Sequence, residues 1–397
     1  MRGLAGRNIV LGVSGSIAAY KAADVASRLV QAGATVDTVM TPSAIRFVAP
    51  LTFQSLTHRP VVTDLFDPRS ELSIDHVALA RRADAVLIAP ATADLLSRMA
   101  HGLADDPVTA TVLATAAPVI VCPAMESHMY RHPATQENLE RLVQRGVRVV
   151  EPAAGRLASG QHGIGRLADP GLIIGTVRQV LGRNGDLSGR RVVVTAGGTR
   201  EAIDPVRYIT NRSSGKMGHA LAEAARDRGA AVVLVTAAPV GPETAAGIDV
   251  RPVSSALEMM AEVQAAVERA DALIMAAAVA DYRPAAFSSH KVKKTQDQWE
   301  LRMVRNPDIL ASVRTTAVKV GFAAETQDLR ENALAKLKAK GLHMIVANDV
   351  TAPGSGFESD TNQVTIIDRS GRVEELPSLP KMDVAHEILD RLVTLLP

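Results

Sequence analysis

The chain has 397 residues, a formal net charge of +2, and 47% hydrophobic but only 3% aromatic residues. This length predicts two or three domains, and aliphatic cores of this kind suit parallel sheets covered by helices. The charge balance gives no electrostatic argument for nucleic-acid binding, and no span reaches transmembrane length. The first residues run directly into a predicted strand and glycine turn, so we do not expect them to be a signal peptide. The single cysteine, Cys122, excludes an intrachain disulfide and a Cys-based zinc site. We therefore expect a cytoplasmic protein with no membrane and no nucleic-acid partner.

The first predicted unit is a strand, a glycine turn and a helix. Residues 9–13 are an apolar run typical of a buried strand, and residues 17–31 place apolar side chains on one helical face. The turn between them offers the N–H groups of Gly15 and Ser16 to a phosphate at the start of the helix. The next predicted strand, 36–40, leads into hydroxyl-bearing residues 41–44 rather than the acidic residue of a dinucleotide site. The pattern favours a mononucleotide such as FMN over NAD.

Strands and helices alternate through the rest of the first half, with predicted strands at 85–89, 118–122 and 147–150. His76 opens a predicted helix and is a candidate acid, base or orienting group, although an isolated histidine is more often structural. Cys122 lies in an apolar run and is expected to be a buried core thiol. Residues 155–170 carry four glycines and no apolar period, which predicts a mobile loop that acts as an active-site lid.

Residues 182–189, GRNGDLSG, are the best linker candidate in the chain. The segment RVVVTAGG that follows echoes the IVLGVSG of the first half, which indicates a second copy of the same architecture. The sequence thus predicts an α/β fold with two tandem Rossmann-like domains. We expect a flavodoxin-like flavoprotein domain over residues 1–182 and a nucleotide-binding domain over residues 190–397.

The second half begins with two turns suited to phosphate. A predicted strand at 191–195 ends at Gly197 and Gly198, where backbone N–H groups can face an anion without an intervening Cβ. The turn NRSSGK at 211–216 precedes a predicted helix, so its hydroxyls, amide and lysine stand at a helix N-terminus. Neither turn has Walker A spacing. One glycine turn alone is more often structural, but two in tandem favour a nucleotide site.

Polar groups also follow later predicted elements. Residues 277–284 end a strand at its carboxyl edge, and a loop with Lys291, Lys293 and Lys294 is expected to face the pocket there and neutralise a triphosphate. A short lysine run alone is more often a solvated charge cluster. Segments 306–310 and 321–326, with Lys336 and Lys340, suit a base and ribose site. The other predicted elements are helices at 256–269, 307–316, 328–340 and 381–396, strands at 318–323 and 343–348, and a small β ribbon at 364–368.

The second half contains six segments in this order: GGTREAIDPVRYITNRSSGKMG, AAAVADYRP, KVKK, NPDIL, GFAAET and ANDV. In the order and spacing of these segments, the chain resembles the bifunctional phosphopantothenoylcysteine decarboxylase/phosphopantothenate-cysteine ligase family of bacterial coenzyme A synthesis. The resemblance implies that CTP activates 4′-phosphopantothenate as an acyl-cytidylate, which the amine of cysteine then attacks. We expect Mg²⁺ to orient the triphosphate. Asn211 is implied to act on the acyl-cytidylate, and Lys291 to assist catalysis and contact CTP. The implied CTP-binding positions are Asp281, Pro307, Asp308, Ile309, Leu310, Phe322, Lys336 and Lys340.

The first half resembles the FMN-dependent decarboxylase of that family through GVSGSIAAYK, TPSA, His76, APATAD and the PAM segment. FMN is implied to oxidise the cysteinyl thiol to a thioaldehyde, which provides an electron sink for loss of the carboxylate. The resemblance also implies a homo-oligomer, with trimeric flavin domains and dimeric ligase domains. The positions implied to contact FMN are Gly15, Ser16, Ile17, Ser43, Ala91 and Thr92.

Two residues depart from the family pattern. Glu126 stands where many relatives have Asn, and it places a carboxylate near the substrate carboxylate. Ser159 stands where many relatives have a lid cysteine that donates a proton, which leaves His162 as an alternative donor. Three readings stay open: a full two-step enzyme, a ligase with a degenerate flavin domain, and a regulatory flavoprotein. The presence of His76 favours the first.

Overall fold

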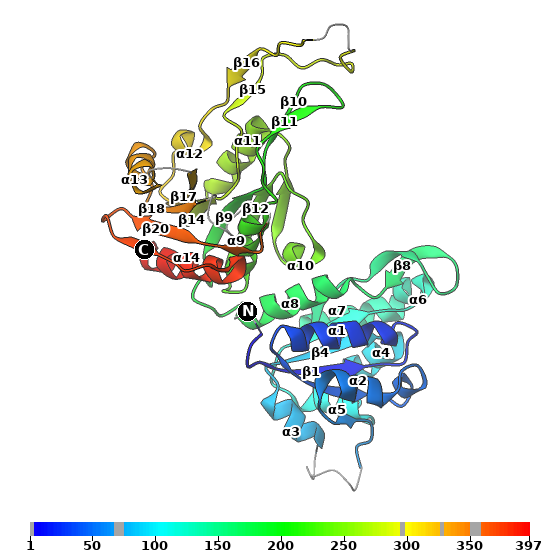
Figure 1. Cartoon of the computed structure of the whole chain (residues 1–397). Helices are drawn as coiled ribbons and strands as arrows, with labels where there is room; N and C mark the ends of the chain where they lie inside the picture. Colours follow the sequence, from blue (N-terminus) through cyan, green and yellow to red (C-terminus); the bar gives the residue numbers. More distant parts are fainter. Residues whose placement is uncertain (1–3, 67–74, 294–297, 326–328, 350–358) are drawn as a thin grey trace. The chain divides into compact units, whose positions relative to one another are not determined.

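The computed structural model describes residues 4–66, 75–293, 298–325, 329–349 and 359–397. The chain divides into two compact units, Met1–Leu181 and Gly182–Pro397. Each unit has a central sheet between two layers of helices (Figure 1), so the prediction of an α/β fold with two Rossmann-like domains is confirmed. Among the described residues, no helix combines the length and the apolar character needed to cross a bilayer.

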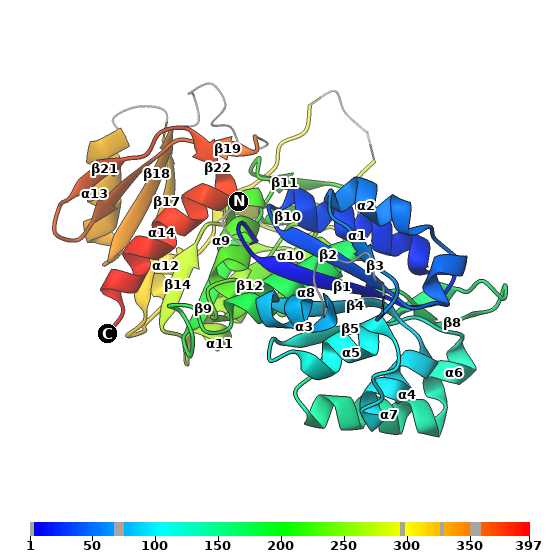
Figure 2. The same ribbon diagram turned by 90° about the horizontal axis from the view of Figure 1, so that it is seen from below.

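The first unit contains a six-stranded parallel sheet in the order β3-β2-β1-β4-β5-β6. This is the Rossmann order, which differs from the 2-1-3-4-5 order of flavodoxin. The strands are β1 (Asn8–Val13), β2 (Thr35–Met40), β3 (Val61–Val62), β4 (Ala85–Ala91), β5 (Val119–Pro123) and β6 (Arg148–Val149). One face is covered by α1 (Ala19–Gln31), α2 (Pro50–Thr57) and α8 (Pro170–Gly182). The other is covered by α3 (Asp75–Arg82), α4 (Ala93–His101), α5 (Pro107–Ala114) and α7 (Pro133–Gln144), as Figure 2 shows.

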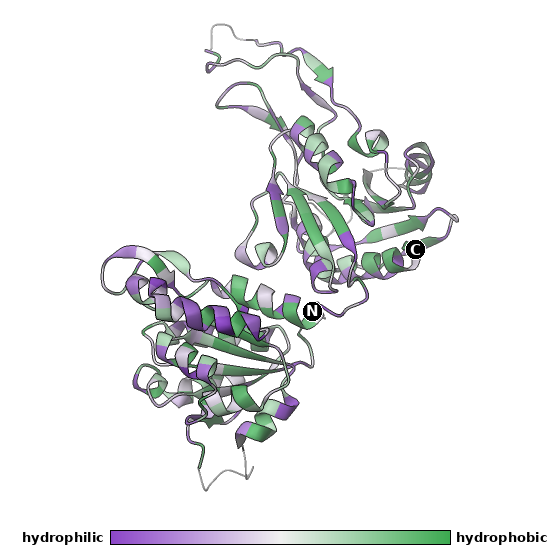
Figure 3. Ribbon diagram, turned by 180° about the vertical axis from the view of Figure 1, so that it is seen from behind, coloured by the Kyte–Doolittle hydropathy of each residue, from purple (hydrophilic) through white to green (hydrophobic). Residues whose placement is uncertain are grey.

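The second unit contains an eight-stranded sheet in the order β13-β12-β9-β14-β17-β18-β20-β21. Its first six strands are parallel: β9 (Arg191–Ala196), β12 (Ala231–Thr236), β13 (Asp249–Pro252), β14 (Ala272–Met275), β17 (Val318–Glu325) and β18 (Met344–Asp349). Helices α9 (Lys216–Arg226) and α14 (Lys381–Leu395) cover one face. Helices α11 (Ala256–Val267), α12 (Ile309–Ser312) and α13 (Leu329–Ala339) cover the other. The strands are hydrophobic along their length (Figure 3) because both faces are buried.

The β ribbon predicted at 364–368 is part of this main sheet. Strand β20 (Val364–Asp368) pairs antiparallel with β18, and β21 (Val373–Glu375) pairs with β20. The alternation of strands and helices in the sequence did not show that two antiparallel strands would extend the parallel sheet at its edge. The short strands β19 (Thr361–Asn362) and β22 (Leu379–Pro380) form a separate pair just before α14.

Two antiparallel pairs extend from the carboxyl edge of the second sheet (Figure 1). The first is β10 (Arg200–Ala202) with β11 (Tyr208–Thr210), and the second is β15 (Tyr282–Pro284) with β16 (Met303–Arg305). Val206, Tyr208, Tyr282, Phe287 and Trp299, which lie on these pairs and their loops, are each more than half exposed. We call these two pairs the arms.

Two further predictions need correction. The predicted loop at 155–170 contains a hairpin of β7 (Ala153–Arg156) and β8 (His162–Arg166), in which Gly155, Gly163 and Gly165 lie within strands and Gly160 lies in the turn. The predicted helix at 307–316 is only the short α12, because Val313 is already extended. The linker at 182–189 stays a prediction; within it, Leu187 is fully buried and its N–H donates to the Arg228 carbonyl at 3.0 Å.

Candidate active sites

In the first unit, the predicted FMN positions meet at the carboxyl edge of the sheet. Ser14 ties two strand ends together, since its hydroxyl donates to the Pro90 carbonyl (2.7 Å) and accepts from the Thr92 N–H (3.0 Å). A Cβ on Gly15 would lie 2.3 Å from the Cβ of Ser43, so the turns after β1 and β2 are in contact. The sequence predicted these turns separately, and the β2-β1-β4 order brings them together. The resulting cradle has backbone N–H groups and hydroxyls that fit a phosphate.

The side chains beside the cradle differ in exposure. Ile17 is 59% exposed, Ser43 is exposed and Ala91 is buried. Thr92 caps α4 by accepting from the Leu95 N–H at 3.3 Å. Ala91 and Thr92 thus contribute mainly backbone groups and the start of α4 to the cradle. Ile17 contributes an exposed apolar side chain.

His76 lies in the first turn of α3, which leads into β4. A helix that precedes a parallel strand begins at the carboxyl edge of the sheet, so His76 lies at the edge that holds the cradle. Its Nδ1 is buried and has no hydrogen-bond partner among the described residues. A buried ring nitrogen of this kind fits a site where substrate or cofactor supplies the partner.

Glu126 and the lid hairpin contact each other. The Oε2 of Glu126 accepts the His128 N–H at 2.7 Å and so caps the short helix α6 (Ser127–Arg131), while Oε1 is buried without a partner among the described residues. The next residue binds the hairpin: the Ser127 hydroxyl donates to the Ile164 carbonyl at 2.6 Å. The Met125 N–H donates to the Gly165 carbonyl at 2.9 Å. The hairpin is therefore docked on the segment that carries Glu126.

Ser159 and His162 lie at the far end of this hairpin. Ser159 is exposed in the connecting turn, and His162 is exposed at the start of β8. Cys122 is fully buried, and burial raises the pKa of its thiol, so it is a core residue as predicted. The described residues contain no cluster of three or more His, Cys, Asp or Glu side chains that could hold a metal.

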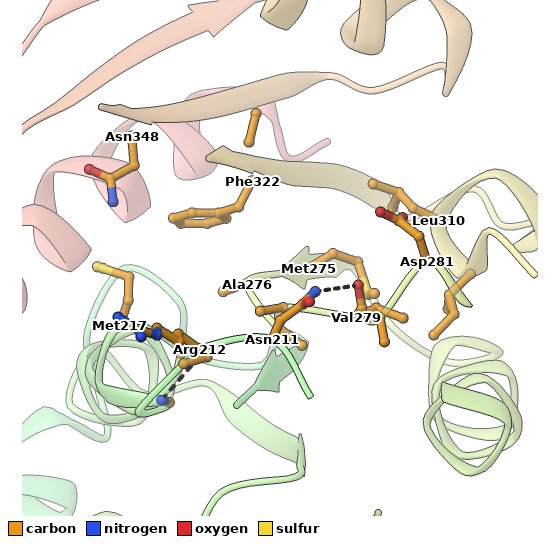
Figure 4. A pocket seen from close by; sticks show the side chains of 18 of the residues that line it. Asn211, Arg212, Met217, Met275, Ala276, Val279, Asp281, Leu310, Phe322 and Asn348 are labelled. Atoms are coloured by element: carbon orange, nitrogen blue, oxygen red, sulfur yellow. Dashed lines mark hydrogen bonds between the residues drawn. The ribbon is translucent and has the colours of Figure 1, made fainter. Parts of the chain in front are cut away.

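The second unit has a cavity of about 520 Å³ at the carboxyl edge of its sheet. It brings together the NRSSGK turn, the segment after β14, the start of α12 and the lysines of α13 (Figure 4). All but one of the implied catalytic and CTP-binding positions of this half line it: Asn211, Asp281, Pro307, Asp308, Ile309, Leu310, Phe322, Lys336 and Lys340.

The geometry of this cavity rests on contacts between the two predicted turns. A Cβ on Gly198 would lie 2.5 Å from the Asn211 carbonyl oxygen, so Gly198 lets the turns approach closely. Gly198 itself is not among the residues that line the cavity, and its role in ligand binding stays a prediction. The Asn211 amide donates from Nδ2 to the Val279 carbonyl at 3.0 Å (Figure 4). This bond leaves Oδ1 as the atom available to a ligand.

At the other end of the cavity, Asp308 caps α12 and pairs with α13. Its Oδ1 accepts the Ala311 N–H at 3.0 Å, and its Oδ2 lies 3.0 Å from Lys340 Nζ. Burial opposes ionisation of Asp308, but the Ala311 bond and Lys340 outweigh it and lower the pKa of the carboxyl. Lys340 is thereby held at the cavity wall.

Lys291 is not among the lining residues, so the expectation that its loop faces the pocket is not met in this structure. Its side chain is exposed, and the neighbouring Val292 is anchored to the arms: its N–H donates to Asp204 at 3.2 Å, and its carbonyl accepts from Arg207 at 2.8 Å. Lys294 and Thr326 lie outside the described residues.

Two family models match the chain: Flavoprotein over residues 2–182, and DNA/pantothenate metabolism flavoprotein C-terminal domain over residues 187–396. The chain is 48% identical over 398 residues to the coenzyme A biosynthesis bifunctional protein CoaBC of Vibrio parahaemolyticus, and the match covers 99% of both chains. The chain belongs to the CoaBC family. CoaBC of Bacillus subtilis is 47% identical over 98% of this chain and 97% of its own, and CoaBC of Escherichia coli K12 is 46% identical over 98% of both.

Membership in the CoaBC family confirms the predicted family and the bifunctional ligase and decarboxylase class of enzyme. It also confirms that the first unit is a flavoprotein domain. A solved C-terminal domain of a CoaBC protein matches 53% of this chain and 97% of its own at 39% identity, with a TM-score of 0.46.

The sequence analysis missed three residues of the ligase cavity: Asp360, which borders it, and Asn362 and Lys381, which line it. One signal was present for Lys381, which begins α14. A lysine at the first position of a helix opposes the helix dipole, and such an unfavourable placement indicates a role in binding.

Proposed function

We propose that the second unit joins 4′-phosphopantothenate to cysteine through an acyl-cytidylate made from CTP, and that the first unit decarboxylates the product with FMN. The observation that carries the ligase half is the single cavity that unites Asn211 with the CTP-binding motif positions. In the activation step, the substrate carboxylate attacks the α-phosphorus of CTP, and the bond to the pyrophosphate breaks. In the second step, the amine of cysteine attacks the acyl carbon, loses a proton, and CMP leaves.

Asn211 acts in the second step. Because Nδ2 is held by the Val279 carbonyl, Oδ1 can accept a hydrogen bond from the attacking amine and orient its lone pair. Arg212 and the turn before α9 face the phosphates, where a helix N-terminus favours negative charge. Lys291 reaches CTP when the loop it belongs to closes over the cavity, and Mg²⁺ is carried by the nucleotide phosphates.

FMN fits the cradle in the first unit, because only glycine at position 15 leaves room between the turns after β1 and β2. When bound, FMN supplies the two-electron oxidation and reduction that make loss of the carboxylate possible. His76 orients the substrate through its unpartnered Nδ1, and the docked hairpin excludes water from Glu126. Ser159 or His162 on the hairpin gives the final proton.

Exposed apolar side chains support assembly into trimers of flavin domains and dimers of ligase domains. Next to the cradle, the turn before α1 exposes Ile17, and α1, α2 and the turn between β2 and α2 expose Tyr20, Ile45, Phe47 and Leu51, of which Leu51 is 67% exposed. In the ligase unit the exposed aromatic residues gather on the arms. Patches of this kind mark contacts with other chains. We place the enzyme in the cytoplasm.

The test is one incubation of the full chain with 4′-phosphopantothenate, cysteine, CTP and Mg²⁺, followed by mass analysis. The expected products are 4′-phosphopantetheine, CMP, pyrophosphate and carbon dioxide. Accumulation of phosphopantothenoylcysteine would show that only the ligase is active and would favour a ligase with a degenerate flavin domain. Absence of both products, with flavin bound, would favour the regulatory flavoprotein.

A further inference from the structure

Helix α3 carries His76 and rests on the first unit through a small surface. The helix is eight residues long, and of its side chains from His76 onward only Leu79 and Ala80 are buried. Because residues three and four positions apart share one face of a helix, His76 lies on the same face as these two residues. The helix packs on α5 (Figure 1), and the Thr115 hydroxyl donates to the Ala80 carbonyl at 3.1 Å. A slight rotation of α3 about its axis would therefore move the His76 ring away from the cradle.

The C-terminal end of α3 is held by a buried carboxylate on β2. Asp37 is 3% exposed, and its Oδ2 accepts a hydrogen bond from Arg82 Nε at 3.0 Å and lies 2.8 Å from Arg82 Nη2. Arg82 is the last residue of α3 and follows His76 by six positions, which is about 9 Å along a helix axis. The ion pair thus ties the end of α3 that is remote from His76 to the sheet.

Asp37 has a second arginine partner, which belongs to a different part of the chain. The Nε of Arg59 donates to Asp37 Oδ1 at 2.6 Å. Arg59 lies between α2 and β3, and its side chain is 35% exposed, compared with 37% for Arg82. The two arginines therefore make similar contacts with one carboxylate, but only the contact of Arg82 holds the helix that carries His76.

Stability alone does not explain a carboxylate in the strand that also contains the buried residues Val36, Val39 and Met40. Taking a charge out of water is costly, and replacing a buried ion pair by apolar residues of similar volume is often neutral or stabilising. The pair differs from apolar contacts in its directionality. Apolar burial is non-directional, whereas a guanidinium presents its donors in a rigid planar fork. The Asp37–Arg82 pair can therefore fix the rotation of α3, which the contacts of Leu79 and Ala80 leave less restricted.

We propose that Asp37 and Arg82 are positioning residues for His76 in the decarboxylase reaction. No hydrogen bond within the described residues holds the His76 ring through its buried Nδ1, so the placement of this atom depends on the backbone of α3. The ion pair keeps α3 in the rotation that presents the ring to the substrate. The inference rests on the proposed role of His76 and adds how its side chain is kept in place.

The experiment measures kcat and KM for carbon dioxide release from phosphopantothenoylcysteine by the full chain with its flavin. Arg82→Met should lower kcat roughly 10- to 100-fold with little change in KM, because a misplacement of about 1 Å at a reacting group has effects of this size. Arg59→Met is the matched control, since it also leaves Asp37 with one arginine, and it should stay within about twofold of the wild type. Arg82→Lys keeps the charge and should restore part of the activity, and Asp37→Asn should behave like Arg82→Met. Flavin content and the denaturation midpoint should change alike in Arg82→Met and Arg59→Met.

A second readout does not depend on decarboxylation. Diethyl pyrocarbonate acylates accessible histidine rings, and peptide mass analysis gives the rate at His76 relative to the exposed His101 on α4. This rate should rise in Arg82→Met and stay unchanged in Arg59→Met. Equal kcat values for the two arginine variants would overturn the proposal, and so would an unchanged acylation rate at His76 in Arg82→Met. If the wild type releases no carbon dioxide, the proposed decarboxylase function fails, while the acylation rates still show whether the ion pair positions His76.

Discussion

Docking of the lid hairpin should control the decarboxylase, and Gly165→Ala tests this most directly. Gly165 has φ 144°, and a Cβ there would lie 2.1 Å from the Met125 carbonyl oxygen. That neighbour is backbone and has no flexible end that could move aside, so the hairpin must separate from the segment that carries Glu126. Separation breaks the Met125–Gly165 and Ser127–Ile164 hydrogen bonds.

The size of the effect follows from these two bonds. Each contributes about 0.5–1.5 kcal/mol, so undocking costs about 1–3 kcal/mol. If closure is needed for turnover, we expect decarboxylase activity to fall roughly 5- to 150-fold. The matched control is Gly160→Ala in the turn of the same hairpin. Gly160 has φ 85°, and a Cβ there meets nothing within 4 Å, so this variant has backbone strain without the clash.

The assay measures carbon dioxide release from phosphopantothenoylcysteine, with pyrophosphate release by the ligase unit of the same chain as the internal standard. Gly165→Ala should lose the first activity and keep the second, and Gly160→Ala should stay close to the wild type in both. If Gly165→Ala decarboxylates as well as Gly160→Ala, hairpin docking is not required, and the lid hypothesis is refuted.

Three further predictions concern other parts of the chain. Gly15→Ala, whose Cβ would lie 2.3 Å from that of Ser43, should give a colourless protein by absorbance at flavin wavelengths while pyrophosphate release continues; a yellow variant would show that the cradle does not hold the flavin. Asn211→Asp replaces the donor to the Val279 carbonyl with a repelling oxygen, so acyl-cytidylate should accumulate in mass spectra, whereas Lys291→Gln should slow activation itself; full amide formation by both would falsify these roles. The Arg207 side chain first, together with backbone N–H groups, lowers the pKa of Asp204. Its contribution to stability is therefore complete above the unfolded pKa of about 3.9 and is lost as the pH falls through the folded pKa. Asp204→Asn should thus lower the denaturation midpoint at pH 7 but converge with the wild type in acid, and a difference that persists unchanged in acid would refute this.

The sequence was sufficient for the elements whose signal is local. Apolar runs predicted most strands of both sheets, although β3, β12 and β13 were not among the predicted strands. Glycine turns predicted candidate ligand sites, because a missing Cβ and a helix N-terminus act on their immediate neighbours. The assignment of the motif positions from Asp281 to Lys340 as CTP-binding came from the family resemblance rather than from these local signals. The prediction from local sequence was wrong for residues 155–170, where the glycine content indicated a loop. Gly163 and Gly165 are strand residues there, because the hairpin needs them to approach Ser127 and the Met125 carbonyl.

Contacts between distant segments were decided only by the tertiary structure. No local pattern shows that Gly198 lies against the Asn211 backbone, that Asp308 is held by Lys340, or that Val292 is anchored to Asp204 in the arms. The ligase cavity also depends on residues more than 140 positions apart, since Lys216, which lines it, pairs with Asp360. Local propensity acts over a few residues, whereas the charge balance and burial of a site are set by whichever chain segments the sheet order brings to the same edge.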